Sequence, residues 1–338
     1  MNIVKKLLGA SLAIGMLAGC SSKSASSGSS SAQPAGESGT YTIAAAIHSY
    51  EDPFMNMYRE ELSSYFKKIE TDTVKYNVTM TDSKNDAKEQ LKQIDEFIAQ
   101  KVNVIIVDLA DRASADTIVQ KATEAGIPLV FIHNEPFGAE GEGNYRGILD
   151  NASVCYVGTR ASQAGTSQGE IVAELANHGD LNGDGKVSYL MIEGAPEDLD
   201  AQYRTEYSIK ALQASGIEVE CVDDQIAYWD REQSKQITAD ALAQYGHAIE
   251  VVFCNNDTMA YGASDAIKEA GRTVGTDIYL IGADAGDESI EMFQKGELTG
   301  TVLNGMNDQC HKAADAAVQL IKGEAVENYY LFDYVKIR

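Results

Sequence analysis

The chain has 338 residues, of which 44% are hydrophobic, 23% charged and 8% aromatic. This composition is typical of a globular protein rather than a disordered one, and the length is sufficient for two domains. The net charge of −24, from 51 acidic and 27 basic residues, repels phosphate backbones, so we expect no nucleic-acid partner.

Residues 1–20 have the features of an export signal. Lys5 and Lys6 precede an apolar run that ends in Leu17-Ala18-Gly19-Cys20, and the run is too short to span a membrane as a mature helix. The closing tetrapeptide resembles a bacterial lipobox, which implies that Cys20 is diacylated, and two acyl chains give stable anchoring. The alternative is an ordinary secretory signal with an incidental Cys. We predict a lipoprotein that is anchored to the outer face of the cell membrane, or to the periplasmic side of an envelope membrane.

Residues 21–40 are rich in Ser, Gly and Ala, so they cannot bury a core and are predicted to form a flexible tether. The folded body then begins near Tyr41. Its cysteines are scattered without a CxxC pair, which favours buried free thiols over a metal cluster and leaves one disulfide open. They are Cys155, Cys221, Cys254 and Cys310.

From Tyr41 onward, short apolar runs alternate with helical patterns. Leu91, Ile94, Phe97 and Ile98 share one helix face. Repeated βα units predict an α/β fold of two doubly wound parallel-sheet lobes. We place the N-terminal lobe at 41–132 plus 305–327 and the C-terminal lobe at 133–304 plus 328–338, joined by a multi-strand hinge. The predicted strands are 41–47, 74–80, 104–108, 129–132, 187–192, 217–222, 251–254, 279–281 and 300–303.

Polar residues directly follow several of these strands. In parallel sheets, ligands bind at the carboxyl ends of strands, so a cleft between two lobes would collect these side chains. They are residues 48–52, 108, 255–257, 284 and 304. The sequence has no Walker-type phosphate loop, no dinucleotide-binding glycine motif, no Gly-x-Ser-x-Gly and no His-Glu-x-x-His. The five histidines show no metal-ligand spacing, and we expect no enzymatic activity.

The segment Asp180–Ser188 resembles the first part of an EF-hand loop. Oxygen-bearing side chains alternate, with Gly after the fifth position, and Lys186 would contribute its backbone carbonyl. The twelfth position is Met191 instead of Glu, and a predicted strand follows instead of a helix. A structural Ca²⁺ site would therefore need a carboxylate from elsewhere, and the alternative is a polar turn. The side-chain ligands within the loop are Asp180, Asn182, Asp184 and Ser188.

These features together resemble the periplasmic galactose/glucose-binding protein family, which has a type I periplasmic binding fold. The likeness covers nearly the whole folded body, and it is strongest in the loop above and in residues 196–209, 228–230, 250–262 and 300–304. The family takes the missing calcium ligand from a distant strand, and Glu250 matches it here.

The resemblance also implies a sugar site. Asp52 matches a carboxylate that accepts a sugar hydroxyl, while Phe54 and Trp229 match two aromatics that hold the pyranose between them. The remaining matched positions are polar contacts to the hydroxyl rim: Asp200, Arg204, Asn256, Asp284 and Asn304. Several of these residues have a structural alternative: a helix cap or turn for Asp52, Asn256 and Asp284, a surface ion pair for Arg204, and a core position for Trp229. Their joint placement at strand ends favours a site.

Two positions depart from the family pattern. Asp108 stands where the family commonly has Asn, which removes an amide donor unless the carboxyl is protonated. Asp198 stands where the family has His. Both residues keep the lining polar and stay among the predicted sugar contacts.

The function that this resemblance implies is capture of a monosaccharide, galactose or glucose, and its delivery to an ABC transporter, with a chemoreceptor as a further partner in chemotaxis. We expect a monomer. One alternative is a sensor that presents bound sugar to a chemoreceptor or membrane kinase. Two others are a cytoplasmic sugar-responsive repressor, which the signal peptide and charge disfavour, and an enzyme acting on sugars.

Overall fold

The computed structural model describes residues 38–136 and 151–338. The signal peptide, Cys20 and most of the tether lie outside them. The first strand, β1, begins at Gly39, inside the segment predicted as tether. Within the described residues, no helix combines the length and apolar character needed to cross a membrane.

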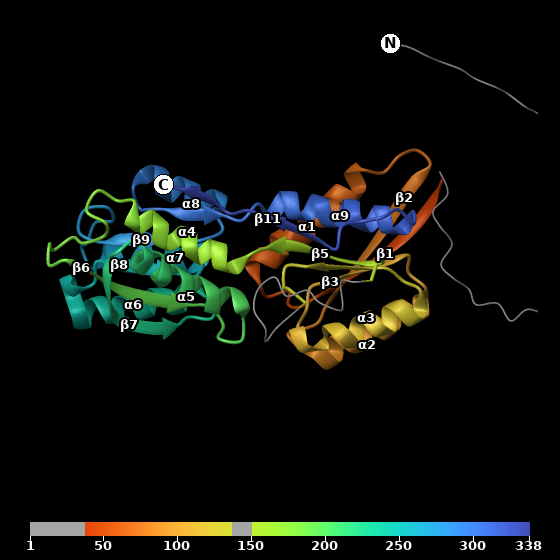
Figure 1. The fold of residues 1–338 in the computed structure, drawn as a ribbon, viewed down its shortest axis with the longest axis horizontal. Helices are drawn as coiled ribbons and strands as arrows, with labels where there is room; N and C mark the ends of the chain where they lie inside the picture. The colour runs from red at the N-terminus through yellow and green to blue at the C-terminus, as the bar shows by residue number, and fades with distance from the viewer. Residues whose placement is uncertain (1–37, 137–150) are drawn as a thin grey trace, which may run out of the picture. The chain divides into compact units, whose positions relative to one another are not determined.

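Strands and helices alternate along most of the chain, as Figure 1 shows. The strands are β1 (Gly39–Ile47), β2 (Val74–Asp82), β3 (Val104–Val107), β4 (Leu129–Ile132), β5 (Val154–Thr159), β6 (Lys186–Glu193), β7 (Glu218–Ile226), β8 (Val251–Cys254), β9 (Tyr279–Ile281), β10 (Thr301–Leu303), β11 (Tyr329–Phe332) and β12 (Val335–Ile337). The α-helices are α1 (Pro53–Lys68), α2 (Ala87–Gln100), α3 (Ala115–Ala125), α4 (Ala161–Ala173), α5 (Leu199–Ala214), α6 (Arg231–Tyr245), α7 (Asp257–Glu269), α8 (Asp287–Lys295) and α9 (Met306–Ile321). Short 3₁₀ turns are η1 (Arg112–Ser114) and η2 (Gly246–Ala248).

The strands form two parallel sheets, which confirms the predicted fold class. The first has the order β11-β5-β4-β3-β1-β2 and the second β7-β6-β8-β9, and every pairing within them is parallel. β10 and β12 pair antiparallel to each other. The sequence division assigned β5 and β11 to the second lobe, whereas their backbone hydrogen bonds place both in the first sheet. β5, β11 and β12 were not predicted from the sequence.

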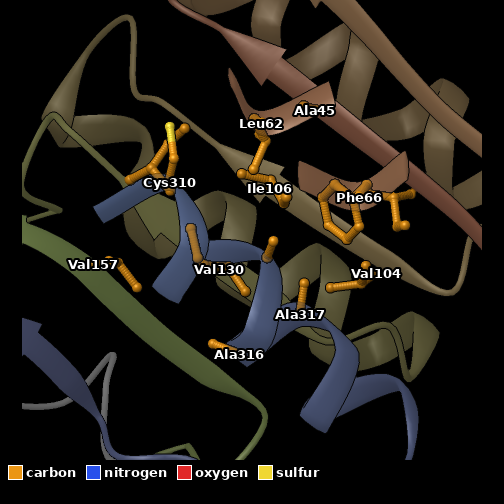
Figure 2. Close-up of a cluster of buried hydrophobic side chains, with 14 of the residues drawn as sticks. Ala45, Leu62, Phe66, Val104, Ile106, Val130, Val157, Cys310, Ala316 and Ala317 are labelled. Atoms are coloured by element: carbon orange, nitrogen blue, oxygen red, sulfur yellow. The ribbon is translucent and has the colours of Figure 1, made fainter. Parts of the chain in front are cut away.

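Each sheet buries both faces, as parallel sheets require. On the first sheet, α1 and α9 cover the face that carries Ile43 and Ile106, while α2 and α3 cover the face that carries Ala44 and Ile105. α9 comes from the far end of the chain, and Figure 2 shows its Cys310, Ala316 and Ala317 among the strand side chains. These small side chains allow the helix to lie close to the sheet.

The second sheet is covered in the same way. α4 and α5 contribute to one cluster of buried side chains, and α6, α7 and α8 to the other. Cys155, Cys221, Cys254 and Cys310 are all free thiols. Cys221 is exposed, although its apolar neighbourhood in the sequence had favoured burial.

Candidate functional site: a cleft at the carboxyl ends of both sheets

A single cavity brings together nine of the ten predicted sugar contacts, with residues from both sheets around it. Nearly all of them follow a strand or begin a helix, which is where parallel sheets place ligand contacts. The lining residues are Asp52, Phe54, His133, Thr159, Asp198, Asp200, Arg204, Trp229, Asn256, Asp284, Asn304, Gln309 and Tyr334.

Asp108 is the predicted contact that does not line the cavity. Its side chain is fully buried, and its two carboxylate oxygens accept from the Nδ1 atoms of His48, at 2.5 Å, and His133, at 3.2 Å. The backbone N–H of His48 donates to the same carboxylate at 3.2 Å. Asp108 therefore holds two imidazoles, of which His133 lines the cavity, and it has no direct route to a ligand.

We call His48, Asp52, Phe54, Asp108 and His133 the first wall. Burial opposes ionisation of Asp108, yet the two imidazoles hold the pKa of its carboxyl well below the usual range. Burial alone would lower the pKa of His133, but Asp108 outweighs it and raises this pKa to about 9. Asp108 likewise raises the pKa of His48, whose Nε2 lies 3.4 Å from Asp52. The carboxylates of this wall are thus paired with protonated imidazoles.

Two of the histidines meet in space although they lie far apart in the sequence. Their spacing along the chain shows no metal-site pattern, and the fold places the ligand atoms of His48, Asp108 and His133 within 4.8 Å of one another. Both imidazoles are hydrogen-bonded to the Asp108 carboxylate.

We call Asp198, Asp200, Arg204, Trp229 and Asp284 the second wall. Arg204 is 5% exposed and lies at its centre. Its guanidinium donates to Asp200 at 2.7 Å and to Asp284 at 3.4 Å, and also to the Asn255 carbonyl at 2.8 Å. One guanidinium thereby serves two carboxylates and fixes their positions.

Ionisation is disfavoured at two carboxyls of the second wall. Burial, with the neighbouring Asp200 charge, raises the pKa of Asp198 to about 6. Burial also raises the pKa of Asp284 to about 7. Arg204 opposes this rise, whereas the negative charges of Asp257 and Asp200 add to it. The wall nevertheless holds three carboxyl groups against one guanidinium.

Three lining residues have backbone φ angles in the left-handed region. They are His133 at 54°, Trp229 at 64° and Asp284 at 118°. Such conformations cost about 1–3 kcal/mol each in non-glycine residues and cluster at functional sites. Gly194 is the neighbour that permits the Trp229 orientation, because a Cβ there would lie 2.1 Å from the indole ring.

Asn256 and Asn304 have structural roles as well as positions in the lining. Asn256 Oδ1 caps α7 by accepting from the Met259 N–H. Asn304 accepts from the Met306 N–H and donates to Asp284 Oδ1 at 3.3 Å. Each amide is held in place by the protein, so it presents its remaining capacity to the cavity in a fixed direction.

Sequence reasoning missed His133, Thr159, Gln309 and Tyr334. His133 directly follows the apolar run of β4, so the strand-end rule could have found it. Thr159 ends β5, a strand that was not predicted, and its hydroxyl lies 2.9 Å from that of Tyr334. Tyr334 lies between β11 and β12, where no sequence signal pointed to the site.

The predicted calcium loop is closed by Glu250, which is 1% exposed. Its Oε1 accepts from the N–H groups of Leu181, at 2.7 Å, and Asn182, at 2.9 Å. Its Oε2 accepts from the Ser188 N–H at 2.9 Å. The fold thus brings the distant carboxylate to the loop, and Met191 lies in the buried core.

The loop side chains Asp180, Asn182 and Asp184 each accept backbone N–H bonds within the loop. Together with Glu250 and Ser188 they form an all-oxygen donor set, which suits Ca²⁺. Among the described residues, the ligand atoms of His48, Asp108 and His133 all lie within 4.8 Å of one another. The carboxylates of Asp180, Asp184 and Glu250 do not come as close together as this.

Residues 43–325 match the family described as periplasmic binding protein domain. The chain belongs to this family. It is 33% identical over 287 residues to the D-galactose/methyl-galactoside binding periplasmic protein of Haemophilus influenzae, covering 84% of this chain and 82% of the relative. It is also 31% identical over 299 residues to a putative rhizopine-binding protein of Rhizobium meliloti, covering 87% and 89%.

Solved structures share the fold. A solute-binding protein of an ABC transporter from Bacillus halodurans with bound myo-inositol has a TM-score of 0.74 at 25% identity, covering 90% of this chain and 96% of that one. One from Actinobacillus succinogenes with bound D-allose has a TM-score of 0.73 at 22% identity, covering 88% and 97%. The resemblance to type I sugar-binding proteins of ABC transporters is confirmed, and the chain is an extracytoplasmic solute-binding protein rather than an enzyme.

Proposed function

We propose that the cleft binds a monosaccharide, with galactose and glucose as the first candidates, and that the loaded protein delivers it to an ABC transporter. The observation that carries this proposal is the composition of the lining: Phe54 and Trp229 lie there among carboxylates, amides and a buried guanidinium. A pyranose has apolar C–H faces and a rim of hydroxyls that both donate and accept. Aromatic rings suit the faces, and planar polar groups suit the rim.

Relatives support the same class of ligand. Similar proteins include binding proteins for galactose, ribose and apiose. Because the polar groups of the cleft are held by the protein, a sugar that lacks one matching hydroxyl leaves a buried group unpaired. Such a group costs about 1–3 kcal/mol, so the site can discriminate between epimers.

The test is a thermal-shift screen of monosaccharides followed by calorimetric titration. Trp229 is the only tryptophan, so its fluorescence reports on the cleft directly. We expect a hexose to raise the melting temperature and to change the emission. If no monosaccharide changes either signal, the sugar-binding proposal is wrong.

We also propose that the Asp180–Ser188 loop and Glu250 bind Ca²⁺ in a structural role. Oε2 of Glu250 accepts a single N–H bond and retains a lone pair for an ion, whereas Oε1 already accepts two. Calcium should raise the melting temperature of the wild-type protein, and a chelator should reverse the rise without removing the response to sugar. Glu250→Gln should abolish the calcium dependence, whereas Glu89→Gln, in a surface ion pair, should keep it. A melting temperature that ignores calcium would exclude the site.

Finally, we propose that Cys20 carries the lipid anchor. In a bacterial host, metabolic labelling with a fatty acid should mark the wild-type protein and leave Cys20→Ser unlabelled and released from the membrane. Labelling of Cys20→Ser would contradict this assignment.

A further inference from the structure

The charge of the cleft is uneven. Four of its lining side chains are carboxylates, and the cationic ones are Arg204 and His133. His133 is paired with Asp108 and Asp52 with His48, while Asp200 and Asp284 share Arg204. This leaves the carboxylate of Asp198.

Asp198 has no ion-pair partner among residues 38–136 and 151–338. One of its oxygens caps α5 by accepting from the Asp200 N–H at 2.9 Å. Arg204 and His133 act on it only at longer range, and Asp200 repels it. A half-buried carboxylate in this position is stabilised by an incoming cation more than by a neutral hydroxyl.

A second observation points to a ligand from the same wall. Arg204 is 5% exposed and lines the cavity, yet its Nε–H has no hydrogen-bond partner among the described residues. A buried donor without a partner is costly, so this N–H calls for an acceptor oxygen. A ligand that offers an oxygen to the Arg204 side chain and a cation to Asp198 would complement both groups.

Resting on the proposed sugar-binding function, we propose that the ligand is an amino sugar of hexose size, whose ammonium group is bound by Asp198. A simple polyamine fits less well, because its several charges would meet Arg204 and it lacks an acceptor oxygen. The rings of Phe54 and Trp229 are compatible with both parts of such a ligand, since aromatic faces attract C–H groups and cations alike.

The test compares glucose and galactose with derivatives that carry a single amino group at C2, C3 or C6. Titration calorimetry at neutral pH and constant ionic strength gives the ratio of affinities for each amino sugar and its parent. We expect at least one derivative to bind about tenfold or more tightly than its parent, because an ion pair of this kind is strong at low dielectric. N-Acetylation of that derivative, which removes the charge, should abolish the gain.

The variant Asp198→Asn isolates the residue. Asn caps helices about as well as Asp, so α5 should still begin at the same residue. The ratio of the affinities for the amino sugar and its parent should fall towards one. Asp86→Asn is the matched control, because Asp86 caps α2 outside the cleft, and it should keep the preference. Thermal unfolding of each variant checks that it is folded.

The outcomes separate the two proposals. If the parent sugars bind and no amino derivative binds more tightly, the ammonium inference is overturned while sugar binding stands. If Asp198→Asn retains the full preference, the assignment to Asp198 is wrong. If neither parents nor derivatives bind, the proposed function fails and the inference with it.

Discussion

The two walls of the cleft differ in how their buried carboxylates are neutralised. The first wall has two carboxylates, Asp52 and Asp108, and places two imidazoles against them within 3.4 Å. The second wall has three carboxylates and one guanidinium. The first wall is neutralised from within the protein, whereas the second retains negative charge at the surface that a ligand meets.

The buried charged residues of the two walls, Asp108 and Arg204, therefore have different roles. Asp108 never touches the cavity, so its role is to hold His133 and His48 in one orientation and one protonation state. Arg204 touches the cavity and also orients Asp200 and Asp284. Pre-arranged groups lose little entropy on binding, which is what a selective site needs.

Removal of Arg204 should have the largest effect. Arg204→Met keeps much of the side-chain volume but leaves Asp200 and Asp284 facing each other without a cation. We expect loss of about 3 kcal/mol of unfolding free energy, since breaking a buried ion pair from one side is strongly destabilising. Sugar binding should fall below detection by calorimetry.

The control for Arg204 is Arg231, which also lies between two carboxylates, Asp265 and Glu288, but on the surface. Arg231→Met should cost less than about 1 kcal/mol and leave binding intact. Urea unfolding measures the loss of unfolding free energy in each variant. Equal losses in the two variants would show that the second wall does not depend on its guanidinium.

Asp108→Asn should have the next largest effect. It should lower the free energy of unfolding, because Asp108 holds the two histidines and does not itself contact the ligand. The substitution removes the charge and replaces one accepting oxygen with an amide NH₂, and the loss of one hydrogen bond to a charged group costs about 2 kcal/mol. The pKa of His133 should fall from about 9 towards its ordinary range. Titration followed by NMR of the histidine ring protons measures this change.

The pH dependence follows from the direction of the shifts. A histidine pKa raised from 6.5 to about 9 stabilises the fold fully below pH 6.5, and this contribution is lost as pH rises to 9. The lowered pKa of Asp108 contributes above its ordinary value of 3.8 and is lost as pH falls. The stability difference between wild type and Asp108→Asn should therefore be largest between pH 3.8 and 6.5. Asp315→Asn, which loses only a bond from the neutral Tyr65 hydroxyl, should show no such profile.

The sequence predicted most of the fold because the βα rhythm is set by local patterns. It missed β5, β11 and β12, and with them Thr159 and Tyr334, because the register of late strands depends on distant partners. Nine of ten predicted contacts lie in one cavity, since residues at strand ends converge. Asp108 was misplaced for a physical reason. Its carboxylate is hydrogen-bonded to His48, which follows β1, and to His133, which follows β4, so it does not face the cleft. The sequence near Asp108 gives no sign of these distant partners.

The aromatic ring of the second wall should give the smallest of these effects. Trp229→Leu removes the indole that lies in the lining, and we expect sugar binding to weaken by about 0.5–1.5 kcal/mol, the contribution of an aromatic contact beyond simple burial. Tyr228→Leu is a matched control, because Tyr228 also has a positive φ, 50°, and is 55% exposed. Both variants carry the same backbone strain, so a difference in titration calorimetry isolates the ring. If the two variants bind sugar equally well, Trp229 is a structural residue of the wall, and the charges of the second wall alone determine what it binds.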